Sequence, residues 1–122
     1  MFVGVGRVLL RLPGARSLKD RRRVIKSYKE RVRARLPALA AEIGDVENHQ
    51  LATVGLCCIS REFSQCQDVL DKALGMARGL ADALVLDTRH EVLPFGDGGI
   101  DLKGGLSDAL AQAALERKFG ES

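Results

Sequence analysis

The chain has 122 residues, of which 46% are apolar, 4% are aromatic and 29% are charged, and its formal net charge is +3. This length allows one domain with a single core. No apolar run approaches the roughly 20 residues of a membrane-spanning helix, and Arg7 and Arg11 interrupt the amino-terminal apolar stretch, so we expect a cytoplasmic protein without membrane contact.

The first predicted element is a strand over residues 2–12. Val8, Leu10 and Leu12 share one face of this strand, and Arg7 and Arg11 share the other. The turn residues at 13–14 end it.

A basic helix follows. Ser17 is suited to cap it, and Asp20 stands at the acidic position of a capping box, so the helix should begin at Leu18. Pro37 ends it. Apolar residues recur at helical spacing on one stripe, which leaves the basic side chains in solvent. The stripe consists of Leu18, Ile25, Tyr28, Val32 and Leu36.

The positive charge is concentrated in this amino-terminal part. Residues 1–37 contain 12 basic and 2 acidic side chains, a formal charge of +10, whereas residues 38–122 carry −7. Like charges one turn apart, such as Lys29 and Arg33, destabilise an isolated helix by roughly 0.2–0.5 kcal/mol per pair, so the cluster favours an anionic partner. We therefore expect a non-enzymatic accessory factor that binds RNA or ribosomal particles electrostatically. The residues expected to contact phosphates are Arg16, Lys19, Arg21, Arg22, Arg23, Lys26, Lys29 and Arg33.

Two strands, a second helix and a last strand are predicted after Pro37. Residues 38–45 and 50–60 form a hairpin whose second, more apolar strand is central in the sheet. Ser60 is suited to cap a helix whose apolar stripe runs from Phe63 to Leu84, and residues 84–93 form the last strand, with the exchange from helix to strand near residues 81–85. This order predicts an α+β, ferredoxin-like βαββαβ sandwich with two helices on one face of a four-stranded antiparallel sheet.

The predicted domain covers residues 1–93, and residues 94–122 extend it. Glycines mark residues 94–105 as a linker, and an amphipathic stretch at 106–119 predicts an appended C-terminal helix. The uncovered sheet face carries Val3, Val5 and Leu9, so we expect a second copy to cover it in a homodimer. A homo-oligomeric module whose basic helix docks an acidic protein is the alternative function.

Three segments in order resemble the YlxP-like family of small, largely uncharacterised bacterial proteins. They are LPGARSLKDRR at residues 12–22, AEIGD at 41–45 and ATVG at 52–55. The resemblance implies a ferredoxin-like fold over roughly residues 1–93. It also implies a link to translation, through gene neighbourhood with an initiation factor and ribosome-binding factor A. His49 departs from the family, which often has Trp there.

Other chemistries have weaker sequence signals. Cys57, Cys58 and Cys66 form neither a disulfide framework nor a zinc motif with His49 or His90, so we expect reduced thiols, no metal and no cofactor.

RNA-recognition motifs and acylphosphatases share the ferredoxin-like fold, and each suggests an alternative function. The strand at 51–60 lacks the aromatic residues on which RNA-recognition motifs stack bases. An enzyme of the acylphosphatase type would need Arg16 and Asn48 at a phosphate, and this alternative is mainly an analogy of fold.

Overall fold

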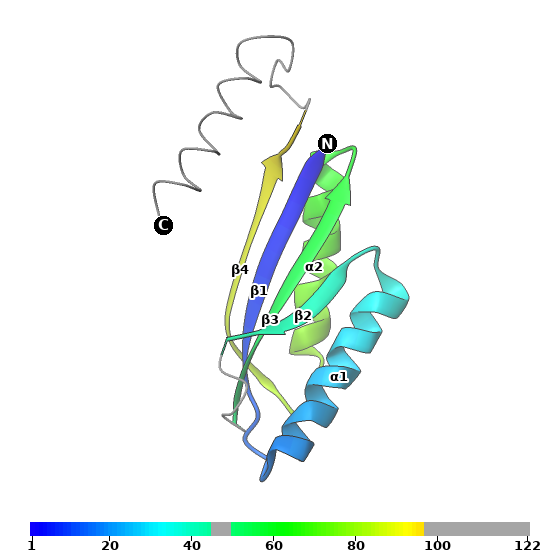
Figure 1. Ribbon diagram of the computed structural model, residues 1–122. Coiled ribbons are helices and arrows are strands. Elements are labelled where there is room, and N and C mark those ends of the chain that lie inside the picture. The colour runs from blue at the N-terminus through cyan, green and yellow to red at the C-terminus, as the bar shows by residue number, and fades with distance from the viewer. Residues whose placement is uncertain (45–49, 97–122) are drawn as a thin grey trace, which may run out of the picture.

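The computed structural model describes residues 1–44 and 50–96, which form a four-stranded antiparallel sheet and two helices (Figure 1). The sheet order is β2-β3-β1-β4, which is the predicted ferredoxin-like arrangement. Most of the linker predicted at residues 94–105, from residue 97 on, and the helix predicted at 106–119 lie outside the described residues. The elements in chain order are β1 (Phe2–Arg11), α1 (Leu18–Arg35), β2 (Leu39–Ile43), β3 (Leu51–Ser60), α2 (Phe63–Arg78) and β4 (Leu84–Pro94).

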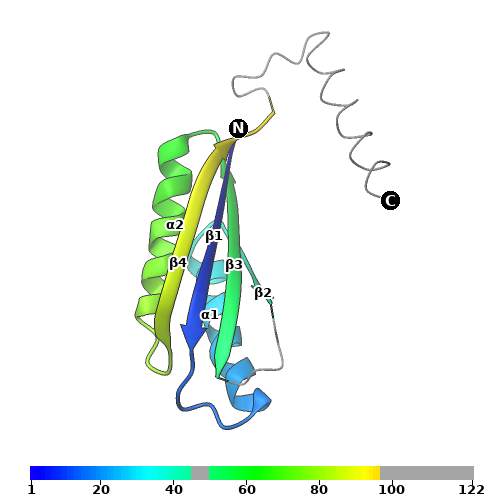
Figure 2. The same ribbon diagram turned by 90° about the vertical axis from the view of Figure 1, so that its left-hand side faces the viewer.

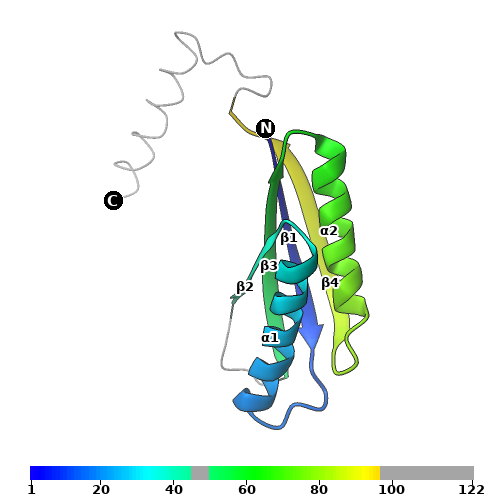
Figure 3. The ribbon, with the colours of Figure 1, turned by 90° about the vertical axis from the view of Figure 1, so that its right-hand side faces the viewer.

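Both helices lie on the same side of the sheet (Figures 2 and 3). The core between the two layers contains Val8 and Leu10 of β1 and Val54 of β3, all fully buried. The hydroxyl of Tyr28 in α1 donates to the carbonyl oxygen of Ala73 in α2 at 2.8 Å, so the two helices are joined within the core. Neither helix within residues 1–44 and 50–96 is long and apolar enough to cross a lipid bilayer.

The start of α1 is as predicted, but the start of α2 differs. Ser17 is the N-cap of α1, and its hydroxyl accepts from the backbone N–H of Asp20. The prediction that Ser60 caps α2 is wrong, because Ser60 still belongs to β3 and the N-cap is Glu62, whose side chain makes no capping bond. The Ser60 hydroxyl instead accepts from the backbone N–H of Glu62 at 3.1 Å and lies 2.6 Å from the side-chain oxygen of Gln65.

The C-terminal ends of α2 and β4 also differ from the predicted boundaries. The helix ends at Arg78 with Gly79 as its C-cap, so Leu84, the last residue of the predicted stripe, is the first residue of β4. The strand extends through Pro94, one residue beyond the prediction. The backbone N–H of Phe95 then donates to the carbonyl of Met1 at 2.8 Å, which continues the pairing of the two chain segments.

The sheet surface opposite the helices, here called the open face, is largely apolar. Its residues follow from the register, in which Val5 lies opposite Cys57 on one side and Glu91 on the other. Cys57 in turn lies opposite Leu39. The large apolar side chains exposed on this face include Val5, Leu39, Ile43, Ile59, Leu86 and Leu93.

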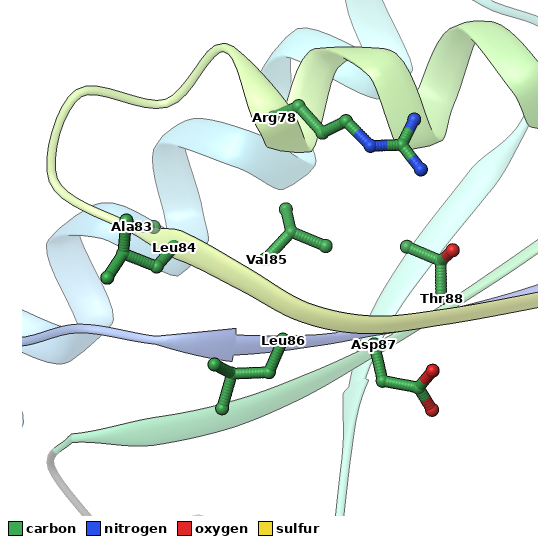
Figure 4. A pocket seen from close by; sticks show the side chains of 7 residues that line it. All are labelled: Arg78, Ala83, Leu84, Val85, Leu86, Asp87 and Thr88. Atoms are coloured by element: carbon green, nitrogen blue, oxygen red, sulfur yellow. The ribbon is translucent and has the colours of Figure 1, made fainter.

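A register shift in β4 adds one residue to the open face. Leu9 pairs with Asp87 and Leu10 with Val85, so Leu86 is an extra residue between them. Figure 4 shows Leu86 and Asp87 on the same side of β4, while Val85 points toward α2. This bulge therefore adds an apolar side chain to the face that the helices leave uncovered.

Candidate functional site

The loop before α1 is closed by its own hydrogen bonds. The backbone N–H of Ala15 donates to the carbonyl of Leu12 at 3.0 Å, and that of Arg16 donates to the Asp20 carboxylate at 3.1 Å. The Asp20 carboxylate therefore lies at the helix N-terminus and supplies a negative charge where a phosphate would otherwise bind. The loop is a turn followed by a capped helix, and Asn48, which the acylphosphatase alternative requires, lies outside the described residues.

Arg21 is not on the solvated face of α1, so this part of the prediction is wrong. Its side chain is 1% exposed and forms an ion pair with Glu42 of β2, while its Nε donates to the carbonyl of Leu51 in β3 at 3.2 Å. Arg21 lies three residues after Leu18 and four before Ile25, so its spacing places it on the buried stripe. The charge of Arg21 is thus committed to holding α1 against β2 and β3.

Four of the predicted residues line one hollow between α1 and β2, here called the basic groove. Ile25, Glu30 and Glu42 complete its lining. Glu42 is already paired with Arg21, and Glu30 lies 3.9 Å from the Lys26 ammonium in an exposed pair that contributes little. The basic residues of the groove are Arg22, Lys26, Lys29 and Arg33.

The spacing of these four residues explains why they meet. Positions 22, 26, 29 and 33 follow one another at steps of four, three and four, so they form a stripe along the flank of α1. β2 lies next to α1 (Figure 3) and contributes Glu42 to the lining of the groove. Among the described residues, no ion pair joins Arg22, Lys29 or Arg33 to an acid, so most of the positive charge in the groove is uncompensated.

The remaining predicted residues lie outside the groove. Arg16 and Lys19 are exposed at the start of α1, where they extend the positive surface. Arg23 lines a different hollow together with two acids, Asp20 and Asp82, so its charge is partly offset. Glu42, the groove residue that the sequence prediction lacks, belongs to the AEIGD segment but gives no sign of burial by its residue type.

The thiols divide into one exposed and two packed groups. Cys57 is exposed on the open face, whereas Cys58 and Cys66 are buried, as expected. Burial raises the pKa of the Cys58 thiol to about 11, and a hydrogen bond with Cys66 adds to this shift. Cys58 is therefore protonated and unreactive at neutral pH.

His90 is the histidine within residues 1–44 and 50–96, and it lies against polar side chains of α2. His90 contacts the side-chain amide of Gln67 at 2.7 Å and lies 3.7 Å from the Asp71 carboxylate, at the exposed edge of the fold. No group of three or more potential metal ligands occurs in the described part of the chain.

A further hollow at the edge of β4 has no convergent chemistry (Figure 4). The Arg78 guanidinium lies on the α2 side of the strand, close to Val85 and Thr88, whereas the Asp87 carboxylate points to the opposite side. The strand therefore separates the Arg78 guanidinium from the Asp87 carboxylate. The basic groove remains the best candidate for a functional site.

The chain has similarities to other proteins at the level of family and fold. A family model described as "Protein of unknown function (DUF503)" matches residues 3–90. No curated protein matches the chain significantly. The de novo designed protein Foldit4 has a TM-score of 0.49 at 13% identity, covering 79% of this chain and 100% of its own.

Two further solved structures have lower TM-scores. The designed protein LFR1 1 with ferredoxin fold reaches 0.45 at 10% identity, covering 86% of this chain and 96% of its own. A REP-associated tyrosine transposase bound to a REP hairpin reaches 0.38 at 13% identity, covering 77% and 57%. The family match extends from β1 into β4, so it coincides with the described fold.

Proposed function

We propose that this chain, which belongs to the DUF503 family of proteins of unknown function, binds RNA phosphates through its basic groove. The observation that carries the proposal is the gathering of four basic side chains in one hollow, where, among the described residues, only Lys26 has an acidic partner of its own. Phosphates bound in the groove would relieve the repulsion among these side chains, and the basic side chains would displace the cations condensed on the RNA.

The shape of the groove suits a nucleic-acid backbone. The stripe from Arg22 to Arg33 covers twelve residues of α1, and the eleven steps between its ends correspond to about 16 Å along the helix axis. That length follows several consecutive phosphates of one strand. Lys and Arg stems also reach outward from the helix, so the bound strand need not enter the fold.

The binding we propose is independent of base sequence. The exposed side chains of β1 and β3 on the open face include no aromatic ring, and the Phe2 ring packs edge-on against Phe63 with centroids 6.0 Å apart. Bases therefore have no ring to stack on in these strands. Phosphate contacts fix position and affinity but carry no sequence information.

The resemblance of residues 12–22 to YlxP-like proteins supports a cytoplasmic accessory role in translation or ribosome maturation. Such a role requires binding without catalysis. It is consistent with a groove lined mainly by basic side chains, with no serine, cysteine or histidine among its lining residues.

The test is the salt dependence of binding to a fluorescent single-stranded polyuridine oligonucleotide. If each basic side chain of the groove neutralises one phosphate, the four side chains contribute about −2.8 to the slope of log affinity against log salt, from about −0.7 per contact. A variant with Arg22, Lys26, Lys29 and Arg33 changed to Gln should therefore lose most of that slope and bind at least about tenfold more weakly at low salt.

The matched control removes the same charge elsewhere. It changes Arg31, Arg35, Arg61 and Arg78, all exposed and outside the groove, to Gln. The control should retain most of the affinity and slope. Equal losses in the two variants would reject the groove as the binding surface, and absence of RNA binding at low salt would favour an acidic protein partner.

A further inference from the structure

The open face of the sheet has the character of a protein interface. Leu39 and Ile59 are 64% and 68% exposed, and Val5, Ile43, Leu86 and Leu93 are also exposed on the described surface. The exposed apolar side chains extend across all four strands, from β2 to β4. An apolar surface of this extent marks a site of protein contact.

The centre of the open face carries both signs of charge. Arg7 and Arg89 lie directly opposite each other on β1 and β4, an arrangement that destabilises a sheet. Asp87 lies 4.0 Å from Arg7, and Glu91 follows Arg89 on the same face of β4. In a dimer with a two-fold axis this patch faces the same patch of the second copy. Each ion pair between an arginine of one copy and a carboxylate of the other would therefore form twice.

The size of the open face favours a second copy over the chain's own tail. The three strands of 10 or 11 residues cover about 33 Å by 14 Å, and β2 with 5 residues adds about 16 Å by 5 Å, which gives about 550 Å² before the corrugation of the side chains is counted. Stable interfaces bury about 800 Å² per partner. Residues 106–119, even as one continuous helix, would extend only about 21 Å by 10 Å, about a third of this face.

We propose that the open face is the interface of a homodimer, with Arg7 and Arg89 of each copy against Asp87 and Glu91 of the other. This face lies on the opposite side of the sheet from the helices (Figure 2), so the dimer leaves the basic groove free. The dimer proposal and the RNA-binding proposal can therefore be tested independently, and either can be wrong while the other holds.

Cys57 is a built-in reporter of this interface. It lies on the open face between Val5 and Leu39, whereas the other two thiols are buried in the core. In the full-length protein a second copy should protect Cys57 from a thiol reagent at high concentration and expose it on dilution. Light scattering should give twice the 13.2 kDa of one chain under the protecting conditions.

Two charge variants test the pairing. Asp87→Lys with Glu91→Lys leaves only bases at the centre of the face, and Arg7→Glu with Arg89→Glu leaves only acids. Each variant alone should dimerise at least tenfold more weakly than the unmodified protein. A mixture of the two should form a heterodimer that protects Cys57 again. All four residues are exposed, and circular dichroism verifies that the variants fold.

Three results would overturn the proposal. A monomer with reactive Cys57 at all concentrations would mean that the face is uncovered. A monomer with protected Cys57 that becomes reactive in a full-length Leu110→Asp, Phe119→Asp variant would assign the face to the tail. A dimer that keeps Cys57 reactive and ignores the charge variants would place the interface elsewhere.

Discussion

At the scale of single residues, Arg21 and Glu42 form the polar link between the helical layer and the sheet. Arg21 contacts β2 through Glu42 and β3 through the carbonyl of Leu51, so one side chain joins three elements. Its side chain is 1% exposed and that of Glu42 is 19% exposed, so water offers little compensation if one partner is lost.

Replacing Arg21 with Met should destabilise the fold by about 3 kcal/mol, the lower end of the range for a buried pair that loses one partner, because Glu42 is partly rather than fully buried. Urea unfolding measures the change. The neighbouring Arg22→Met, which alters an exposed groove residue, should change stability by about 0.5 kcal/mol or less. Adding Glu42→Gln to Arg21→Met should recover part of the loss, and equal stability of the two single variants would contradict the burial of Arg21.

Tyr28, the single tyrosine of the sequence, gives a pH-dependent prediction. Burial raises the pKa of its hydroxyl from 10.0 to about 12. The unfolded chain therefore releases this proton first, so the stability that the neutral hydroxyl contributes is complete below pH 10 and is lost as the pH rises toward 12. The loss amounts to about 2 kcal/mol.

Two measurements examine this. Tyrosinate absorbance of the folded protein should have its midpoint near the raised pKa. Tyr28→Phe should cost about 1 kcal/mol at neutral pH, through loss of the hydrogen bond to Ala73, and should unfold with a shallower pH dependence above pH 10. Since Cys58 also titrates in this range, the informative quantity is the difference between the two proteins. Identical pH dependence would contradict the burial of the hydroxyl.

At the scale of elements, the close packing of α2 on β1 depends on a glycine. A Cβ atom at Gly4 would lie 2.8 Å from the Cys58 sulfur and 2.9 Å from a methyl carbon of Leu70, both of which are buried. By contrast, Gly75 lies on the exposed side of α2 with no atom near its Cβ position. The same substitution should therefore have opposite effects at the two sites.

Gly4→Ala should destabilise the protein by about 1–2 kcal/mol, because the helix must move away from the strand or its side chains must leave their preferred rotamers. Gly75→Ala should stabilise it by up to about 1 kcal/mol, because alanine favours the helix. Thermal unfolding of the two variants gives both values. A gain in stability from Gly4→Ala would show that Cys58 and Leu70 move aside at no cost.

The order of the elements can be predicted from the sequence because each element has two faces of different polarity. Val8 and Leu10 alternate with Arg7 and Arg11 in β1, and this period of two survives into the structure. The cap of α2 is less predictable. It depends on which residue leaves the strand backbone, and that residue is Glu62 rather than Ser60.

The basic groove is predictable only in part. The stripe of basic side chains follows from helical spacing, but the presence of Glu42 in the groove depends on β2 lying next to α1, which no local pattern specifies. The prediction that Arg21 is solvated fails because it weighs the charge of the residue over its position. In its position between Leu18 and Ile25, Arg21 faces the sheet with the apolar stripe.

At the scale of the whole molecule, the charge distribution acts on stability as well as on binding. The formal +10 of residues 1–37 is largely carried by one layer, and the groove places like charges within one helical turn. Their repulsion is screened over about 8 Å at physiological ionic strength, so added salt should stabilise the folded protein.

The four-site Gln variant of the groove should therefore unfold at the same or a higher temperature than the unmodified protein at low salt. Relief of the like-charge pairs contributes about 1 kcal/mol. The midpoint of the unmodified protein should rise with salt more steeply than that of the variant, as measured by thermal unfolding across ionic strength. Parallel curves would mean that the groove charges do not repel one another measurably.

The central place of β1 has a consequence for synthesis on the ribosome. β1 is the first strand to be made, yet its two neighbours are β3 and β4, and Phe2 pairs with Pro94. At about 5–20 residues per second, roughly 4–16 s separate the completion of β1 from that of its last partner. β1 has no strand to pair with until β3 is complete at Ser60, and its other edge stays unpaired until β4 follows. An unpaired strand edge is a template for pairing with another chain. We therefore expect chaperones to bind the nascent chain in the period before β4 is made.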